Sequence, residues 1–70
     1  MSESRTYRLT EIVGTSSESV DDAIRNGIER AGRTLRNLDW FQVVEVRGAI
    51  SGTDINSYQV TMKVGFRLDD

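Results

Sequence analysis

The side chains of this sequence that could do chemistry are one indole, one amide and two guanidinium groups. Trp40 is the only tryptophan, and it lies just after a predicted helix. An indole can stack on a flat aromatic ligand. Gln59 carries both a donor and an acceptor, which match the imide edge of a pyrimidine-like ring. Arg47 and Arg67 lie on predicted strands and could pair with a phosphate.

Each of these four residues also has a structural interpretation, and the residue types alone favour it. Trp40 could cover the end of the helix at the edge of the core, and Gln59 could be an exposed strand residue. Strand arginines are more often partners in salt bridges, here with Glu45 or Asp69. The residues taken singly therefore leave binding and structural roles open.

Two further segments could bind ions, and for both we expect a structural role instead. Gly14–Ser17 precedes a helix and could receive an anion. However, Glu18 and the following aspartates already supply negative charge there, which favours simple capping. Asp21 and Asp22 could hold a hard cation, but a solvated helix start is the simpler interpretation. The sequence has no phosphate loop, no paired-carboxylate signature and no cluster of transition-metal ligands.

The composition excludes several classes of protein. The 70 residues carry a net charge of −2, with 11 acidic and 9 basic side chains and no His or Cys. Disulfides are excluded, a structural zinc site is close to excluded, and the commonest general base and the thiol nucleophile are missing. The acidic balance argues against a nucleic-acid partner, and no apolar run is long enough to cross a membrane. The first residues show no secretory signal, so we expect a cytoplasmic protein.

The small size predicts self-association. We expect one domain over residues 1–70, in which only 37% of the residues are hydrophobic. Ordering the chain costs roughly 1.5 kcal/mol per residue, and a core of this size offsets that cost poorly. Without disulfides or zinc, contact with further copies is the remaining common source of stability. We therefore expect an oligomer.

Hydrophobic periodicity predicts a strand followed by a helix. The alternation over Arg5–Val13 is typical of a strand, and the polar residues 1–4 before it are expected to fray. Gly14–Glu18 interrupts the alternation, with Thr15 or Ser16 as the helix cap. A stripe of period 3.6 follows, from residue 20 to residue 38, and predicts a helix of about twenty residues. Gly27 lies on this stripe, which predicts a close contact with a sheet.

Two further strands complete a β-α-β-β order of the α+β class. The second is predicted from Trp40 to Ile50, with Phe41, Val43 and Arg47 on one face. A turn over residues 51–54 leads to the third strand, Ile55–Leu68, whose even-numbered residues from Tyr58 onward form an apolar face. If the first two strands run parallel, the helix connects them and the third strand pairs antiparallel between them.

Read together, these segments resemble the dodecin family. The resemblance extends from Tyr7 to Leu68 without an obvious gap, and four segments carry it: Glu11–Ser16, Thr34–Phe41, Val46–Gly48 and Tyr58–Leu68. The most specific features are the Leu-Asp-Trp-Phe sequence around Trp40 and the Val-Gly-Phe-Arg-Leu sequence near the end, at this spacing in so short a chain.

The resemblance implies a subunit whose three-stranded, antiparallel-type sheet partly wraps around one helix and that assembles into a hollow homo-dodecamer. It implies flavins, FMN or riboflavin, bound as stacked pairs at two-fold interfaces. Trp40 takes the position of the indole that stacks on the flavin, and Gln59 that of the amide that hydrogen-bonds it. Arg47 and Arg67 match arginines near the phosphate or ribityl chain. The implied role is flavin storage and photoprotective sequestration, without catalysis. Some bacterial members also bind coenzyme A at separate sites, for which the resemblance points to no particular residue of this sequence.

Ala49 departs from the family, in which many bacterial members carry His and archaeal ones an acidic residue after the Arg-Gly pair. The missing polar group leaves the choice of flavin and its affinity open. It also keeps a second hypothesis open, an oligomer of the same fold that serves as a structural or interaction module and has lost or weakened flavin binding. A flavin enzyme ranks last, because a ring covered by Trp40 leaves little room for a substrate.

Overall fold

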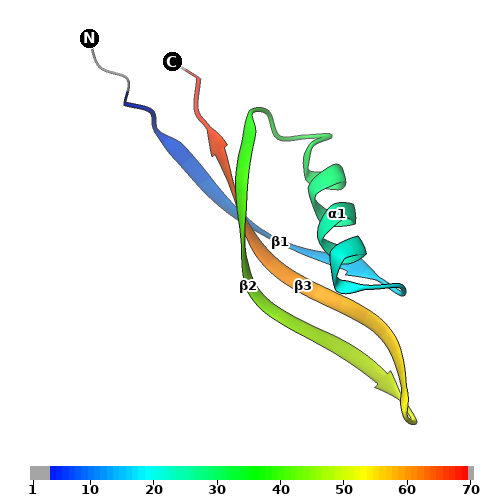
Figure 1. Ribbon diagram of the computed structural model, residues 1–70. Coiled ribbons are helices and arrows are strands. Elements are labelled where there is room, and N and C mark those ends of the chain that lie inside the picture. The colour runs from blue at the N-terminus through cyan, green and yellow to red at the C-terminus, as the bar shows by residue number, and fades with distance from the viewer. Residues whose placement is uncertain (1–3, 70) are drawn as a thin grey trace.

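The structure is a computed structural model that describes residues 4–69 and contains one helix and three strands. In chain order these are β1 (Tyr7–Ser16), α1 (Val20–Ala31), β2 (Leu38–Ser51) and β3 (Asp54–Arg67) (Figure 1). The predicted β-α-β-β order is therefore confirmed. Of the polar start expected to fray, residues 1–3 lie outside the described part of the chain.

The three strands form one sheet with the order β1-β3-β2. Because β3 pairs antiparallel with both neighbours, β1 and β2 run in the same direction at the two edges. The helix connects these edge strands and lies on one face of the sheet, as Figure 1 shows. This arrangement confirms the predicted topology. The two-residue hairpin loop begins at Gly52, whose φ of 65° suits the tight turns that join antiparallel strands.

The strand β1 extends through Ser16, three residues beyond its predicted end at Val13. Gly14 does not break the strand; it pairs with Val60 and lets the helix approach. A Cβ atom built on Gly14 would collide with the carbonyl group of Ala23 and lie 3.2 Å from the Cα of Gly27. The glycine is thus a contact point between strand and helix, which a local sequence pattern cannot distinguish from a turn.

The helix begins after Ser19, whose side chain accepts a hydrogen bond of 3.0 Å from the backbone N–H of Asp22. The predicted caps, Thr15 and Ser16, are therefore wrong. The hydroxyl of Ser16 instead accepts from the backbone N–H of Glu18 at 2.8 Å and donates to the carboxylate of Asp22 at 2.7 Å. Because these groups satisfy one another, the start of the helix has the structural role expected for it.

The helix ends at Ala31 and spans 12 residues rather than about twenty. Gly32 is its C-cap, and the backbone N–H groups of Thr34 and Leu35 turn back to the carbonyl of Ala31, at 3.2 and 2.9 Å. The apolar stripe continues past this end because Leu38 packs against the same core from β2. Periodicity alone therefore overestimated the length of the helix.

The core lies between the helix and β3. Ala23, Val60, Met62 and Val64 are at most 1% exposed and form its centre. The apolar face predicted for the third strand is thereby confirmed. Gly27 lies against it, since an added Cβ would be 2.9 Å from the Cε of Met62, and the predicted close contact between this glycine and the sheet is also confirmed.

Much of the apolar surface lies outside this core. Among the described residues 4–69, ten large hydrophobic residues are exposed, and Ile50 is the most exposed at 73%. The molecule measures 59 × 20 × 14 Å, and its radius of gyration of 14.7 Å exceeds the value of about 11 Å typical of a compact domain of this length. In Figure 1 the β2–β3 hairpin projects beyond the helix. An elongated subunit with an exposed apolar surface fits the expected self-association. No helix among the described residues is long and apolar enough to cross a membrane.

Candidate functional site

The four candidate residues lie on the face of the sheet that the helix leaves uncovered, which we call the open face. In β3 the buried residues Val60, Met62 and Val64 point to the helix, so the alternate residues Gln59 and Arg67 point to the open face. The register places the other two residues on the same side. Arg47 is paired with Gln59, and Trp40 is paired with Gly65.

A bulge at the start of β2 directs Trp40 to the open face. Leu38 is paired with Phe66 and Trp40 with Gly65, so three residues of β2 oppose two of β3. Without the extra residue, Asp39, alternation would place Leu38 and Trp40 on one face. The bulge separates them, and Leu38 joins the core while the indole lies on the opposite side of the sheet.

A second register shift in β2 lies between Val43 and Glu45, and the residues before and after it therefore do not follow a single alternation between the two faces of the sheet. Phe41 and Val43 are paired with the inward-facing residues of β3, whereas Arg47 lies on the open face. The prediction that these three residues share a face is therefore wrong, because strict alternation does not survive the extra residue at this point of the strand.

The indole of Trp40 lies on the backbone of β3 at Gly65. A Cβ atom added to Gly65 would collide with Cε2 of the indole and would lie 2.5 Å from Cζ2 and 2.9 Å from Cδ2. The ring of Tyr7 lies beside it, with centroids 6.5 Å apart and a tilt of 52°. Trp40 remains 43% exposed. The indole is thus held from below and from one side, with a large surface left for a stacking partner.

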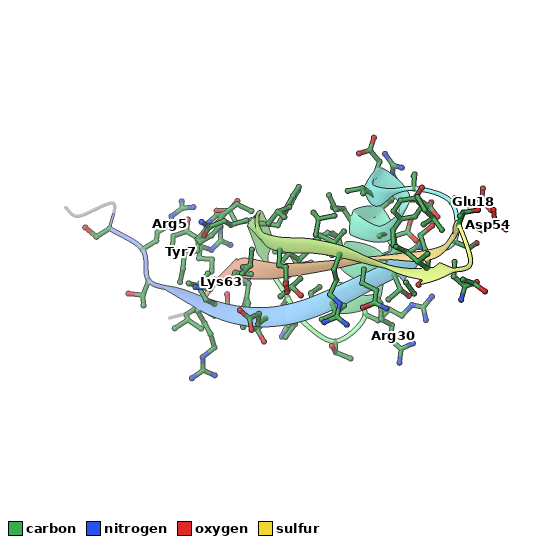
Figure 2. All side chains as sticks on the ribbon, turned by 90° about the horizontal axis from the view of Figure 1, so that it is seen from below. Arg5, Tyr7, Glu18, Arg30, Asp54 and Lys63 are labelled. Atoms are coloured by element: carbon green, nitrogen blue, oxygen red, sulfur yellow. The ribbon has the colours of Figure 1, made fainter. Side chains whose placement is uncertain are left out.

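Within one chain the candidates fall into two groups. Trp40 and Arg67 lie near one end of the sheet, and Arg47 and Gln59 form a cross-strand pair nearer the hairpin. Gly65, below the indole, is six residues from Gln59 along β3, a separation of about 20 Å at 3.3 Å per residue. Figure 2 shows Tyr7 near the end of the molecule opposite to Asp54. Stacking and hydrogen bonding need contacts of about 3–4 Å, and Trp40 and Gln59 of one chain are therefore not in direct contact.

Asn37, which the sequence analysis missed, joins the start of β2 to the end of β3. Its Nδ2 donates to the carbonyl of Arg67 at 3.3 Å and to the carboxylate of Asp69 at 2.8 Å. Its own carbonyl accepts from the N–H of Arg67 at 3.0 Å. Asn37 has a φ of 61°, a conformation that asparagine tolerates better than most residues. This conformational tolerance of asparagine is the only sequence signal that could have indicated a special role for Asn37.

The remaining candidate segments show no arrangement typical of an ion site. The described residues contain no group of three acidic, histidine or cysteine side chains that could hold a metal ion. Ser16 and Asp22 are engaged in the hydrogen bonds at the start of the helix. The open face is therefore the candidate site.

A family model described as Dodecin matches residues 6–69. The chain belongs to the dodecin family. A dodecin from Thermus thermophilus is 47% identical over 66 residues, which cover 94% of this chain and 96% of the relative. The family resemblance seen in the sequence is confirmed.

Solved dodecin structures share the fold over nearly the full length of the chain. The dodecin from Streptomyces davaonensis is 68% identical with a TM-score of 0.91, and the match covers 94% of this chain and 97% of that one. The dodecin from Streptomyces coelicolor is 51% identical with a TM-score of 0.93, and the match covers 99% of both chains.

Three structures of the Thermus thermophilus dodecin are of single-residue variants. In one a tryptophan is replaced by phenylalanine, and in each of the other two an arginine is replaced by alanine. The tryptophan precedes the first arginine by seven residues, and the second arginine follows the first by twenty. Trp40, Arg47 and Arg67 have the same spacing in this chain.

Proposed function

We propose that this protein binds flavin, FMN or riboflavin, as stacked pairs between the Trp40 side chains of neighbouring subunits, and that it stores and photoprotects the bound flavin. One observation carries the proposal: the indole of Trp40 rests on the glycine backbone of β3 and is 43% exposed on the open face. A large aromatic surface held in this way is suited to a flat aromatic ligand.

The residues of the open face fit the chemistry of a flavin. A bound flavin supplies a flat ring with a hydrogen-bonding edge and, in FMN, a phosphate. Trp40 covers the ring, and Gln59 offers the donor and acceptor for its edge. Arg47 and Arg67 carry the charge for the phosphate or the ribityl chain. The substituted tryptophan and arginines of the Thermus thermophilus dodecin have the spacing of Trp40, Arg47 and Arg67, which supports these assignments.

The site is composed of more than one chain. Gly65, which lies below the indole of Trp40, is about 20 Å from Gln59 along β3, and we infer that a flavin that contacts both side chains receives them from different subunits. Exposed apolar side chains such as Ile50 and Ile55 supply surface for the contacts between subunits. We propose the hollow homo-dodecamer of the family as the assembly. Coenzyme A stays a prediction without assigned residues.

The same stacking favours storage over catalysis. Trp40 covers the ring on which a substrate would have to lie, and the sequence contains no His or Cys to act as general base or nucleophile. Trp40 also donates an electron to a light-excited ring and recovers it, which ends the excitation without net chemistry. We infer that the protein is not an enzyme. Turnover of a nicotinamide cofactor by the purified protein would contradict this inference.

Ala49 supports the second candidate, a structural or interaction oligomer that binds flavin weakly or not at all. Ala49 is paired with Ser57, two residues beyond the Arg47–Gln59 pair on the open face. Its methyl group offers no hydrogen bond to a ligand. The aromatic stacking surface is unaffected by this residue, and we therefore rank flavin binding first.

A fluorescence titration tests the proposal. FMN is titrated with ligand-free protein, and riboflavin is titrated in parallel because it lacks the phosphate. We expect saturable quenching near one flavin per subunit, a lower affinity for riboflavin, and an affinity for FMN that falls as salt is added. Assembled protein that quenches neither flavin would favour the structural oligomer.

A further inference from the structure

We propose that Asn37 is a positioning residue for the flavin site. Its hydrogen bonds fix the start of β2 against the end of β3. They thereby orient Trp40 toward the ligand and hold Arg67 beside the ligand. This inference rests on the proposed function. It concerns an exposed polar residue that lies three positions before Trp40 and outside the core. Its contribution therefore comes from hydrogen bonds and backbone conformation rather than from burial.

The hydrogen bonds of Asn37 engage both backbone polar groups of Arg67. The backbone N–H of Arg67 donates to the carbonyl of Asn37, and the carbonyl of Arg67 accepts from the Nδ2 of Asn37. The same Nδ2 also donates to the carboxylate of Asp69. Next to this contact, the N–H of Leu68 donates to the carbonyl of Thr6 at 2.9 Å. The end of β3 is thus tied to both edge segments of the sheet, and Arg67 is fixed between them.

Because Asn37 lies immediately before β2, its hydrogen bonds influence the face of the sheet on which Trp40 lies. The bulge that turns Trp40 to the open face begins one residue later, between Leu38 and Trp40. A shift of one residue in this register would place the indole on the helix side. Asn37 determines where the pairing begins, because it bonds to Arg67 immediately before Leu38 pairs with Phe66. The φ of 61° at Asn37 directs the chain into this pairing after the loop.

The chain offers a matched control in Asn26. Its Nδ2 donates to the carbonyl of Thr15 at 3.1 Å and to the carboxylate of Asp22 at 3.4 Å, and it is exposed like Asn37. Both asparagines therefore bond to the backbone of a neighbouring strand and to one carboxylate, which for Asn26 lies within the helix itself. Only Asn37 lies next to the bulge. If the side-chain hydrogen bonds serve only stability, substitutions of Asn26 and of Asn37 have similar effects. If Asn37 positions Trp40, only the substitutions of Asn37 change the fluorescence of Trp40.

The experiment compares Asn37→Gly, Asn37→Asp and Asn26→Ala with the unsubstituted protein. Glycine keeps the left-handed backbone without the amide. Aspartate tolerates the same backbone but places a carboxylate where the Nδ2 donated to the carboxylate of Asp69. Because Trp40 is the only tryptophan, the emission and anisotropy of the fluorescence of ligand-free protein report the solvent exposure and the mobility of its indole. FMN affinity is measured on the same samples.

We expect both Asn37 variants to show lower anisotropy and red-shifted emission of Trp40, and to bind FMN about fivefold more weakly, in line with lost hydrogen bonds. Asn37→Asp is affected more than Asn37→Gly, and Asn26→Ala matches the unsubstituted protein. Unchanged Trp40 fluorescence in Asn37→Gly, or an equal change in Asn26→Ala, overturns the inference. If the unsubstituted protein itself binds no flavin, the proposed function fails, and the anisotropy comparison still decides the role of Asn37.

Discussion

Gly65 is the support on which the indole of Trp40 rests, and its replacement by alanine is the sharpest perturbation of the site. The added methyl group would lie 2.5 Å from Cζ2 of the indole, whereas carbon atoms in contact prefer about 3.5 Å or more. The ring must therefore move away from β3 by about 1 Å. The strand itself gains from the exchange, since glycine within a strand costs roughly 0.5–1 kcal/mol relative to alanine.

The displaced indole lowers flavin affinity while the fold persists. Aromatic pairs contribute about 0.5–1.5 kcal/mol beyond burial. Loss of about 1 kcal/mol for an indole corresponds to a roughly fivefold weaker affinity, and a flavin pair loses this amount at each of its two indoles. The assay is FMN fluorescence quenching, together with the emission spectrum of Trp40 in ligand-free protein.

Gly32→Ala serves as the control for Gly65→Ala. An added Cβ at Gly32 meets its nearest atom at 3.4 Å, and its φ of −66° suits alanine. We expect this variant to bind FMN with unchanged affinity. Unchanged affinity and unchanged Trp40 emission in Gly65→Ala would refute the reasoning, because the indole would then not depend on the glycine.

Substitutions of the other candidate residues on the open face weaken flavin binding in ways that distinguish their roles. Trp40→Ala weakens FMN binding by on the order of 2–3 kcal/mol, since stacking is lost from two symmetry-related rings; unchanged affinity in a titration removes Trp40 from the site. Gln59→Ala weakens binding but leaves the assembly intact, as measured by solution mass; a monomeric variant means that Gln59 is structural. Arg47→Ala and Arg67→Ala reduce the affinity for FMN more than for riboflavin and flatten its salt dependence; equal losses for both flavins argue against a phosphate contact.

The order and arrangement of the elements could be predicted because they depend on local patterns. The apolar face of β3 has strict period 2, and the face of α1 that bears Ala23 and Gly27 has period 3.6. Both faces meet in the core, as the sequence indicated. The end of the helix could not be found in this way, because Leu38 continues the stripe from a different element.

The position of the candidate residues on one face could be predicted only in part. Gln59 and Arg67 follow from the alternation of β3. The faces on which Trp40 and Arg47 lie depend on two register shifts in β2. These shifts have no clear sequence signature, because the extra residue is defined only by how β2 pairs with β3. The contacts of Asn37 were also beyond prediction, since its partners lie 30 and 32 residues away along the chain.

Sedimentation velocity monitored at the absorbance of the flavin tests the central claim most directly. The claim is that flavin occupies a site composed of Trp40 from one subunit and Gln59 from another. We predict that all bound FMN sediments with an oligomer, at about one flavin per subunit, and that none accompanies a monomer. FMN that sediments with the 7.9 kDa chain, or that remains free beside a fully assembled oligomer, would contradict the account.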